Sequence, residues 1–570
     1  MKTLLLDIET NGLDWKKPDF KIHCVCAKEL ETGIIRQWTL TASSSINPLD
    51  YINQYNAVVA HYGQFFDFPV LEHVFNQKIT AKKLDTKVLA SLIFPEFKSH
   101  KLADWGDRLG LSKKTDFEYK EENYQTFTPQ MLEQCHRDVE ILEKLYKHLL
   151  AQNYSPLAMD IETEIATIIQ RQVELGVAFN EKLAEQMYVD LIGKREKLTV
   201  GLQGLFKPWY AKDKEFIPKK DSKDGYTAGV PLTKIELNTF NPGSTDQIAN
   251  RLMTLYRWQP TKFTETGKPA MDGAVLASLP YPEAKQLAEY ADIKKIIGML
   301  GEGEQAWLKL VKNGRLHGRV NTNGAVTGRM THFEPNLAQV PAVGTFYGSE
   351  SRSLFVASPG YVLVGADASS LELRCLAHFM AKYDNGDYVK KLLQGDIHTT
   401  NMHAAGLETR DQAKTFIYGL IYGAGDEKIG KIIGKGQQEG RKIRTQFLRQ
   451  TPALAKLRED VINAAKKGYI LGLDKRKLLI RSEHSALNTL LQSAGALIMK
   501  QALIIAHKKK PDLRLVLTIH DEFQVEALPE ESSEVGKLLV DSIKEAGMYF
   551  NFRCPLDGEY KSGLTWKDTH

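Results

Sequence analysis

The stretch YVLVGADASSLELRCLAHFM, residues 361–380, decides the fold expected for the second half of the chain. Its first residues, Tyr361 to Ala366, form a short apolar run typical of a buried strand, and Ser370 to Met380 carry apolar residues at helical spacing. Asp367 stands where the strand ends and before the helix begins. A carboxylate at that edge of a sheet is free to bind a metal ion, so the segment predicts a strand–helix unit with a functional acid.

A second acidic segment, IHDEF at residues 519–523, contains Asp521. Two β-type runs, Leu513 to Ile519 and Phe523 to Ala527, are separated by three residues, and this spacing predicts a tight hairpin. If the hairpin adjoins the strand that ends at Asp367 in one sheet, the two aspartates meet. Two aspartates that bind two Mg²⁺ ions are the minimum for phosphoryl transfer from a nucleoside triphosphate.

The segment RDQAKTFIYGLIYG, residues 410–423, lies between the two acidic segments. Arg410, Lys414, Tyr418 and Tyr422 recur every fourth residue and therefore form one slowly drifting stripe on a helix. Cations suit phosphates, and aromatic rings suit a base and a sugar. Taken alone, the segment is better described as an amphipathic helix with solvated cations and core tyrosines. Its combination with the two aspartates favours a nucleotide site.

The N-terminal sequence LLLDIET, residues 4–10, brings a different set of acids. Asp7 and Glu9 share one face of a strand, where two carboxylates repel each other unless a cation lies between them. Asp67, in HYGQFFDFPVL, and Asp138, in EQCHRDVEIL, add carboxylates from two later segments. Four such groups could hold two Mg²⁺ ions and activate water against a phosphodiester.

The composition excludes several classes of protein. Of 570 residues, 43% are hydrophobic and 25% are charged, which is typical of soluble globular proteins and argues against disorder, collagen and coiled coils. The five cysteines are scattered, and Cys24 and Cys26 fit two apolar positions of a strand better than a metal site. The apolar run before Asp7 is too short for a signal peptide, and we expect no membrane helix.

Charge and pattern divide the chain into parts. Residues 1–150 hold 19 Lys and Arg against 21 Asp and Glu, whereas the remaining 420 residues hold 56 against 49. The acidic first part alternates strand-like and helix-like segments, which predicts an α/β domain that ends near residues 150–156. The basic remainder weakly suggests an anionic polymer as partner. Within it, residues 207–243 are rich in Lys, Gly, Pro and Asp and are predicted to be an exposed loop.

The acids at the front resemble those of the 3′–5′ proofreading exonucleases of the DEDD class, which have an RNase H-like fold. The resemblance implies metal ligands at Asp7, Glu9, Asp67 and Asp138. Two positions depart from the family pattern: Gln134 stands where the family has a water-orienting Tyr, and Tyr62 lies in the stretch where the family has an Asn. We therefore expect an exonuclease that is active but weakened.

The segments around Asp367, Lys414 and Asp521 closely resemble motifs A, B and C of family A DNA polymerases. DASSLELRCLAHFM, RDQAKTFIYGLIYGAGDEKIG and NGAVTGRMTHFEPNLAQVP further resemble the replicative polymerases of short-tailed phages. The resemblance implies a multidomain α/β and α+β chain. An exonuclease domain at 1–152 would precede a right-hand polymerase domain at 153–570, with a thumb at about 160–312, a palm at about 313–380 and 490–570, and fingers at about 381–489.

The same resemblance implies a role for each matching residue. Asp367 and Asp521 would bind both metals, assisted by the carbonyl of Ala368. The nucleotide contacts would be the triphosphate-binding Arg410, Lys414 and His398, the sugar-facing Tyr418, Tyr422 near the templating position, and Glu372 as the gate against a 2′-OH. Lys414 is also a candidate proton donor to pyrophosphate.

Three residues would contact the DNA itself. Arg329 and Gln492 would read minor-groove acceptors common to all correct base pairs, and His520 would approach the primer end. Arg329 could instead be a phosphate contact, and Gln492 a satisfied core amide.

The expected partners are primer-template DNA, dNTPs and a replicative helicase or processivity factor, in the cytoplasm of an infected host cell. We expect no thioredoxin clamp, because the stretch from Trp209 to Pro242 is short. Three other interpretations stay open: a single-subunit RNA polymerase, a catalytically dead DNA-binding scaffold, and a repair polymerase with a vestigial exonuclease.

Overall fold

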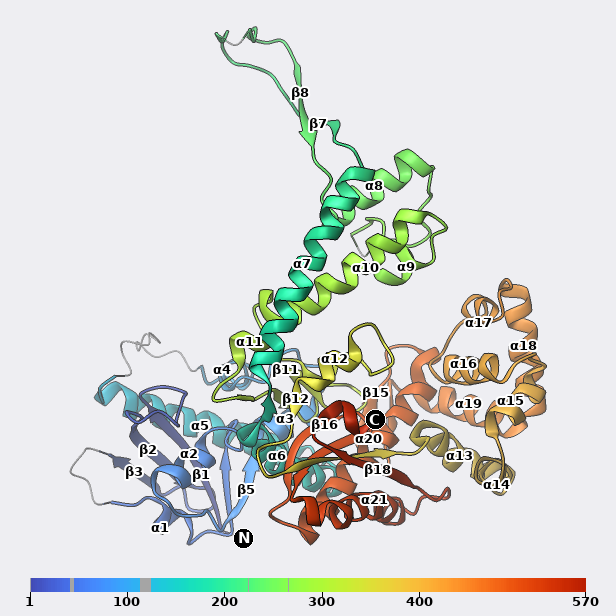
Figure 1. The fold of residues 1–570 in the computed structure, drawn as a ribbon. Coiled ribbons are helices and arrows are strands. Elements are labelled where there is room, and N and C mark those ends of the chain that lie inside the picture. Colours follow the sequence, from blue (N-terminus) through green and yellow to red (C-terminus); the bar gives the residue numbers. More distant parts are fainter. Residues whose placement is uncertain (1, 41–45, 113–124, 224, 265) are drawn as a thin grey trace. The chain divides into compact units, whose positions relative to one another are not determined.

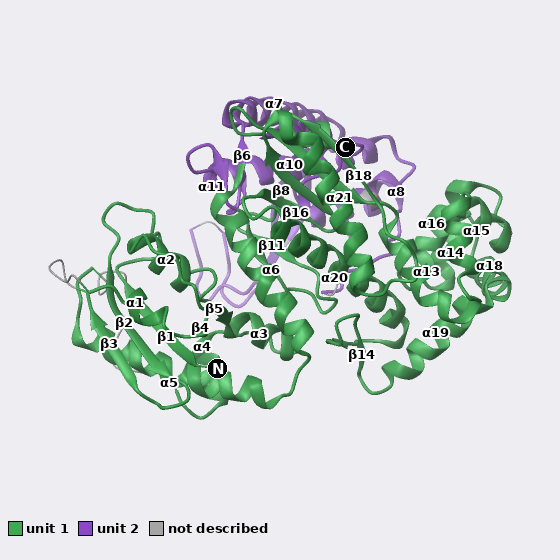
Figure 2. Ribbon diagram, turned by 90° about the horizontal axis from the view of Figure 1, so that it is seen from below, with its two compact units in different colours: residues 1–177, 318–338, 357–570 green, residues 178–317, 339–356 purple. Residues whose placement is uncertain are grey.

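The computed structural model describes residues 2–40, 46–112, 125–223, 225–264 and 266–570. The chain forms two compact units (Figure 2). The first comprises residues 1–177, 318–338 and 357–570, and the second comprises residues 178–317 and 339–356. The domain boundaries expected from the sequence stay predictions.

The first unit begins with a five-stranded sheet in the order β3-β2-β1-β4-β5 (Figure 1). Its strands are β1 (Thr3–Thr10), β2 (Ile22–Glu29), β3 (Ile35–Thr39), β4 (Ala57–Ala60) and β5 (Lys82–Asp85). β1 pairs antiparallel with β2 and parallel with β4. The helices around it are α1 (Leu49–Ile52), α2 (Asp67–Val74), α3 (Thr86–Ile93), α4 (Leu102–Arg108) and α5 (Pro129–Ala151).

The strands β1, β2 and β4 of this sheet have buried side chains on both faces, because successive residues point to opposite sides. Leu5, Cys24 and Cys26 pack on the side of α5, whereas Leu4 and Leu6 pack in a second cluster. The predicted α/β domain and the buried strand positions of the two cysteines are therefore confirmed.

A second sheet of the same unit has the order β16-β17-β13-β18 and is antiparallel throughout. It consists of β13 (Val362–Ala368), β16 (Arg514–Ile519), β17 (Glu522–Ala527) and β18 (Gly558–Gly563). The helices α6 (Pro156–Leu175), α13 (Leu371–Asp384), α20 (Ala486–Lys509) and α21 (Ser532–Tyr549) accompany it. The hairpin and the strand that ends near Asp367 thus lie in one sheet, as predicted.

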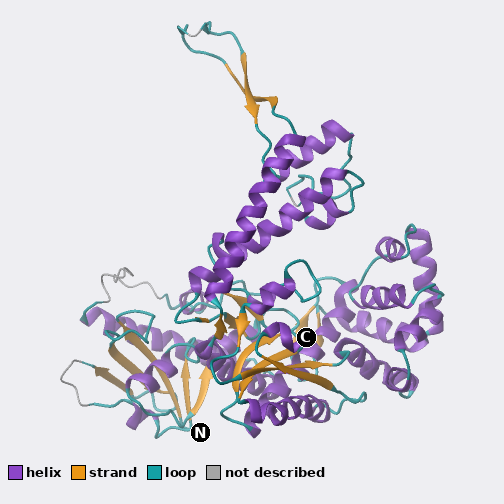
Figure 3. Cartoon of the chain, viewed as in Figure 1, coloured by secondary structure: helices purple, strands orange, loops and turns teal. Residues whose placement is uncertain are grey.

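The remainder of the first unit is mostly helical (Figure 3). Six helices follow α13: α14 (Asp387–Gln394), α15 (Ile397–Ala405), α16 (Arg410–Ile421), α17 (Asp426–Ile432), α18 (Gln437–Gln450) and α19 (Pro452–Ala465). Two small hairpins complete it, one of β10 (Arg319–Asn321) and β11 (Thr331–Phe333), the other of β14 (Tyr469–Leu471) and β15 (Lys477–Leu479). Thr409 and Gln412 form a capping box that begins α16.

The helical segment Glu483–Lys509 corrects the expectation that the sequence holds no long apolar stretch. It is long and apolar enough to span a membrane, with a mean hydropathy of 1.4. However, 89% of its apolar window is buried inside the protein. This burial is typical of the core helix of a soluble protein, since α20 packs against α6, α13 and α21.

The second unit is built on two long helices, α7 (Glu181–Leu205) and α10 (Pro282–Ile297). Its other elements are β6 (Val177–Phe179), β7 (Trp209–Phe216), β8 (Leu232–Asn238), α8 (Thr245–Tyr256), α9 (Gly273–Ala277), α11 (Trp307–Leu310), β9 (Arg315–Leu316), α12 (Gly348–Ser353) and β12 (Phe355–Val356).

The loop predicted for residues 207–243 is wrong in part, because β7 and β8 form an antiparallel hairpin that extends beyond α7 (Figure 1). Thr233, Ile235 and Leu237 alternate along β8, a pattern of period two that favours a strand. The Gly and Pro residues that suggested a loop lie mostly in the connection between the strands.

Candidate functional site

The two aspartates expected to meet do so at one edge of the second sheet. Asp367 lies near the end of β13, and Asp521 lies in the turn between β16 and β17. The backbone N–H of Ala368 donates to the carbonyl of Asp521 over 3.1 Å. Glu522 and Glu559 stand opposite Asp367 on the two flanking strands.

The charges of this edge are poorly compensated. Burial, followed by the repulsion of Asp521, Glu522 and Glu559, raises the pKa of Asp367 to about 7. Burial also raises the pKa of Asp521, against the opposing effects of a backbone hydrogen bond, His520 and Arg329. The site therefore concentrates carboxylate oxygens that a divalent cation would stabilise.

Glu522 differs from the two aspartates because donors surround its carboxylate. Trp566 Nε1, Gln524 Nε2 and His570 Nε2 lie 2.7, 2.5 and 3.2 Å from Oε1. Burial alone would raise the pKa of Glu522, but these three contacts lower it. The carboxylate of Glu522 is thus already held by three neighbouring side chains. The sequence offered no signal for Trp566 or His570, because they lie in the C-terminal turn at residues 566–570, at least 44 residues along the chain from Glu522.

The cationic residues of the predicted stripe lie on α16, and Lys414 is exposed there. Arg410 Nε is 2.6 Å from Asp396 Oδ2, and Asp396 also accepts from the backbone N–H of His398 over 3.1 Å. The His398 ring lies 6.3 Å from that of Tyr418. Burial, Arg410 and Lys414 lower the pKa of His398 against the effect of Asp396. Asp396, which sequence reasoning missed, therefore organises this group.

Glu372 contacts residues of two other segments, Tyr422 of the α16 stripe and Arg329. Tyr422 Oη donates to Glu372 Oε1 over 2.5 Å, and Arg329 Nη2 lies 3.4 Å from the same oxygen. Burial, then Glu372 and Asp521, raise the pKa of Tyr418. The structure therefore brings together five predicted site residues from four separate segments.

The three residues expected to contact DNA do not lie together: two of them share a pocket, and the third lies outside it. Arg329 and His520 line one pocket, together with Met330, Ala496, Met499, Lys500, Thr518 and Phe523. Desolvation and Arg329 lower the pKa of His520, against the attraction of Asp521. Gln492 is half-buried on α20 and is not among these lining residues. The DNA-contact roles stay predictions.

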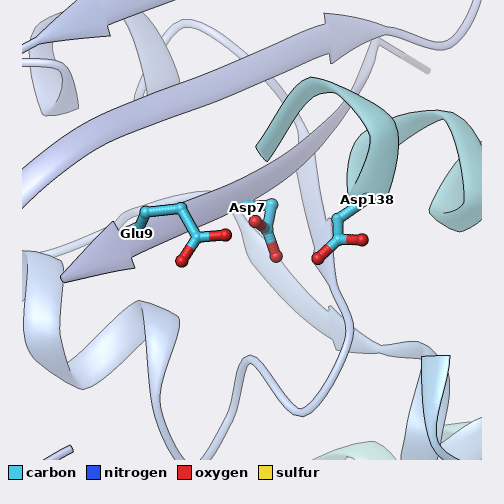
Figure 4. Close-up of side chains that lie close together, drawn as sticks. All are labelled: Asp7, Glu9 and Asp138. Atoms are coloured by element: carbon cyan, nitrogen blue, oxygen red, sulfur yellow. The ribbon is translucent and has the colours of Figure 1, made fainter. Parts of the chain in front are cut away.

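A second acidic site lies on β1, the central strand of the N-terminal sheet, where Asp7 and Glu9 meet Asp138 of α5 (Figure 4). One carboxylate oxygen of each residue lies within 4.8 Å of the others. Gln134 Nε2 donates to Asp138 Oδ1 over 2.9 Å, and Cys135 Sγ donates to the carbonyl of Asp7 over 3.2 Å. Gln134, which departs from the family pattern, therefore holds one of the acids.

Asp67 stands apart from this group of three. It is buried in the first turn of α2, and burial, Asp85 and Glu9 raise its pKa to about 8 against the effect of backbone hydrogen bonds. Asp85 is engaged separately, since it accepts from the backbone N–H groups of Tyr62 and Gln64. The structure thus gathers three of the four predicted ligands and leaves Asp67 as their buried neighbour.

Comparisons with known proteins agree with both parts of this fold. The family model for DNA polymerase family A matches residues 231–568, and the RNase H superfamily model matches residues 4–150. The DNA-directed DNA polymerases of Enterobacteria phage T3 and Escherichia phage T7 are each 35% identical to this chain, over 100% of both sequences. Their alignments run over 717 positions against 570 residues here, so these relatives contain segments that this chain lacks.

A solved structure shares the fold: the POL domain of Pol1 from M. smegmatis in complex with DNA primer-template and dNTP. It has a TM-score of 0.78 and 20% identity, and the match covers 99% of this chain and 96% of that one. The expected architecture, an RNase H-like domain followed by a polymerase domain, is therefore confirmed. The chain belongs to DNA polymerase family A and is a DNA-directed DNA polymerase of the podovirus-type phage group.

Proposed function

We propose that this polymerase extends a primer 3′-OH by two-metal nucleotidyl transfer at Asp367 and Asp521, and that its N-terminal domain is a 3′–5′ proofreading exonuclease. The observation that supports the first activity is the convergence of the two aspartates with Glu372, Tyr418 and Tyr422. The primer-template DNA and dNTP of the M. smegmatis complex support the same substrates for this chain.

Mg²⁺ fits both sites by the chemistry of their donors. The polymerase site offers the oxygens of Asp367, Asp521 and the carbonyl of Ala368, and Glu522 and Glu559 stand opposite Asp367, so the site gathers negative charge that a cation would offset. The exonuclease site offers Asp7, Glu9 and Asp138, with Asp67 as a buried neighbour. When bound, Mg²⁺ supplies a lowered pKa for the attacking hydroxyl or water and stabilises the leaving oxygen.

The residues of α16 would bind and orient the nucleotide. Arg410, Lys414 and His398 would hold the triphosphate, which requires the Arg410–Asp396 pair to open or to share its cation. Lys414 would give a proton to the leaving pyrophosphate. Tyr418 would lie against the sugar, and Glu372, fixed by Tyr422, would exclude a 2′-OH.

The exonuclease proposal rests on the group of Asp7, Glu9 and Asp138. Gln134 bonds to Asp138, so its amide orients a ligand rather than the attacking water. Tyr62 likewise does not replace the missing Asn, because its hydroxyl accepts from Arg319 Nη2 over 2.6 Å. We therefore propose an exonuclease that acts more slowly than one with the full family pattern.

The surroundings of the enzyme follow from its phage relatives. We propose that it works in the cytoplasm of an infected host cell, with a replicative helicase or a processivity factor. Thioredoxin is not proposed as a clamp, since the residues between Trp209 and Asn238 form only a short hairpin. A strong increase in product length when thioredoxin is added to a primed single-stranded circle would contradict this.

Primer extension with the unaltered enzyme, two site variants and two control variants tests the two activities. Asp521→Ala should abolish extension, whereas Asp7→Ala should extend normally and lose 3′ degradation of a mismatched end. Glu530→Ala and Asp19→Ala remove exposed carboxylates from the two domains and serve as matched controls. If the unaltered enzyme degrades no mismatched 3′ end, the N-terminal domain is structural and the exonuclease proposal is wrong.

A further inference from the structure

A cluster of four charged side chains is buried beneath the predicted DNA-contacting segment. It consists of Glu162 on α6, Asp474 and Arg476 near β15, and Lys500 on α20, each at most 2% exposed. Arg476 Nη2 lies 2.7 Å from both Glu162 Oε1 and Asp474 Oδ2, and Lys500 Nζ lies 2.5 Å from Glu162 Oε1. The two positive and two negative charges balance.

Such a cluster is weak evidence for stability, because removing charges from water costs about as much as their attraction returns. A buried ionic group can instead specify one local conformation. The structural question is therefore which segment this cluster holds in place.

The segment is the turn between β10 and β11. Arg476 Nη1 donates to Asn323 Oδ1 over 3.1 Å. A Cβ atom on Gly328 would lie 2.6 Å from the same nitrogen, and Gly328 has φ of +78°, a conformation that favours glycine. The guanidinium of Arg476 thus packs directly against both ends of the turn.

Arg329 follows Gly328 immediately and closes this turn. The backbone N–H of Ala325 donates to the carbonyl of Arg329 over 3.2 Å, and the Arg329 side chain reaches Glu372. Lys500, from the same buried cluster, lines the pocket that contains Arg329 and His520. The cluster therefore reaches the neighbourhood of Arg329 twice. Arg476 contacts the turn that precedes it, and Lys500 lines the pocket that contains its side chain.

We propose that Arg476, held by Glu162 and Asp474, is a positioning residue that fixes the turn of the β10–β11 hairpin and thereby sets Arg329 against the primer-template. This inference rests on the proposed function, because it takes Arg329 to contact DNA. Arg476 itself is buried and acts through Arg329.

A double-mutant cycle tests the proposal on the full chain. Arg476→Lys keeps the charge but shortens the reach to Asn323, and it should lower kcat/KM for dNTP on a matched primer about tenfold, mainly through KM. In an Arg329→Ala background, Arg476→Lys should cause no further loss. Lys477→Ala, which changes the exposed residue next to Arg476 at the start of β15, is the matched control and should extend primers normally.

Each other outcome overturns the proposal in a distinguishable way. If Arg329→Ala lowers kcat/KM for dNTP and adding Arg476→Lys lowers it further by the same factor as in the unaltered enzyme, the positioning role is wrong while the DNA contact stands. If Arg329→Ala extends primers like the unaltered enzyme, the proposed DNA contact fails as well. Should Arg476→Lys not fold, Asn323→Ala leaves the buried charges intact and completes the same cycle, with the same expected lack of additivity.

Discussion

Replacing Asp367 with asparagine tests whether the carboxylates of the polymerase site are held together against their repulsion. Without metal, the pKa of Asp367 is raised from 3.8 to about 7, first by burial and then by Asp521, Glu522 and Glu559. Because the folded-state pKa lies above the unfolded one, this group makes the protein less stable as pH rises from about 4 through 7. An uncharged asparagine removes that loss.

The pKa shift sets the size of the effect. A rise from 3.8 to about 7 corresponds to about 4 kcal/mol at 1.36 kcal/mol per unit, before any allowance for solvent. Asp367 as a residue keeps solvent access even though its carboxylate is partly desolvated, so we discount for solvent screening and expect about 2 kcal/mol. In the absence of metal, Asp367→Asn should therefore be more stable than the unaltered enzyme by about 2 kcal/mol at pH 8, and equally stable near pH 4.

Thermal unfolding at pH 4 and pH 8 in a chelator measures the stability difference between the two proteins. The same experiment with Mg²⁺ measures how much the metal stabilises each of them. Mg²⁺ should raise the unfolding temperature of the unaltered enzyme more than that of Asp367→Asn, because it binds the folded site of the former more tightly. Extension should fall about 1,000-fold or more in the variant, as expected when several kcal/mol of transition-state stabilisation are lost. Equal stabilities at pH 8 in chelator, or equal gains from Mg²⁺, would refute the reasoning. Glu530→Gln is the exposed control.

Three further substitutions test single contacts. Gln134→Leu removes one buried hydrogen bond to Asp138, which costs about 1–3 kcal/mol, and should slow 3′-end release from a labelled primer while extension is unchanged. Glu372→Ala removes the side chain facing Tyr422 and should raise ribonucleotide incorporation, measured as the ratio of rNTP to dNTP kcat/KM. Trp566→Phe removes one donor to Glu522 and should lower the free energy of unfolding by about 2 kcal/mol in a urea titration, with extension retained.

Local pattern was enough to place the polymerase aspartates. Asp367 ends an apolar run and Asp521 lies between two such runs, so burial of those runs in one sheet leaves both acids at its edge. The stripe from Arg410 to Tyr422 could be predicted in the same way, because helical periodicity is visible within one segment of the sequence. The placement of Asp7 and Glu9 on one face of β1 could be predicted from the alternation of side chains along a strand.

Contacts between distant segments could not be predicted in the same way. The pairing of Arg476 with Glu162 joins residues from separate elements, and neither residue has a local signal that points to the other. The strands β7 and β8 were missed for a different reason. Their alternation is short and is interrupted in β7 by a bulge between Lys212 and Lys214, so the Lys, Gly, Pro and Asp content of the segment outweighed it.

If Asp367, Asp521 and Glu372 have the roles proposed above, the distribution of these contacts separates the residues of the chemical step from those of nucleotide selection. Asp367 and Asp521 belong to one rigid sheet, so their spacing depends on strand pairing that also holds the core. Glu372, by contrast, is held by Tyr422 and Arg329, which reach it from another helix and from a hairpin turn. Small shifts of either element would move Glu372 while the aspartates stay in place. Under the proposed roles, changes in sugar or base-pair selection should therefore arise from many surrounding positions, whereas loss of the chemical step should be concentrated at the sheet edge and at Lys414, the proposed proton donor.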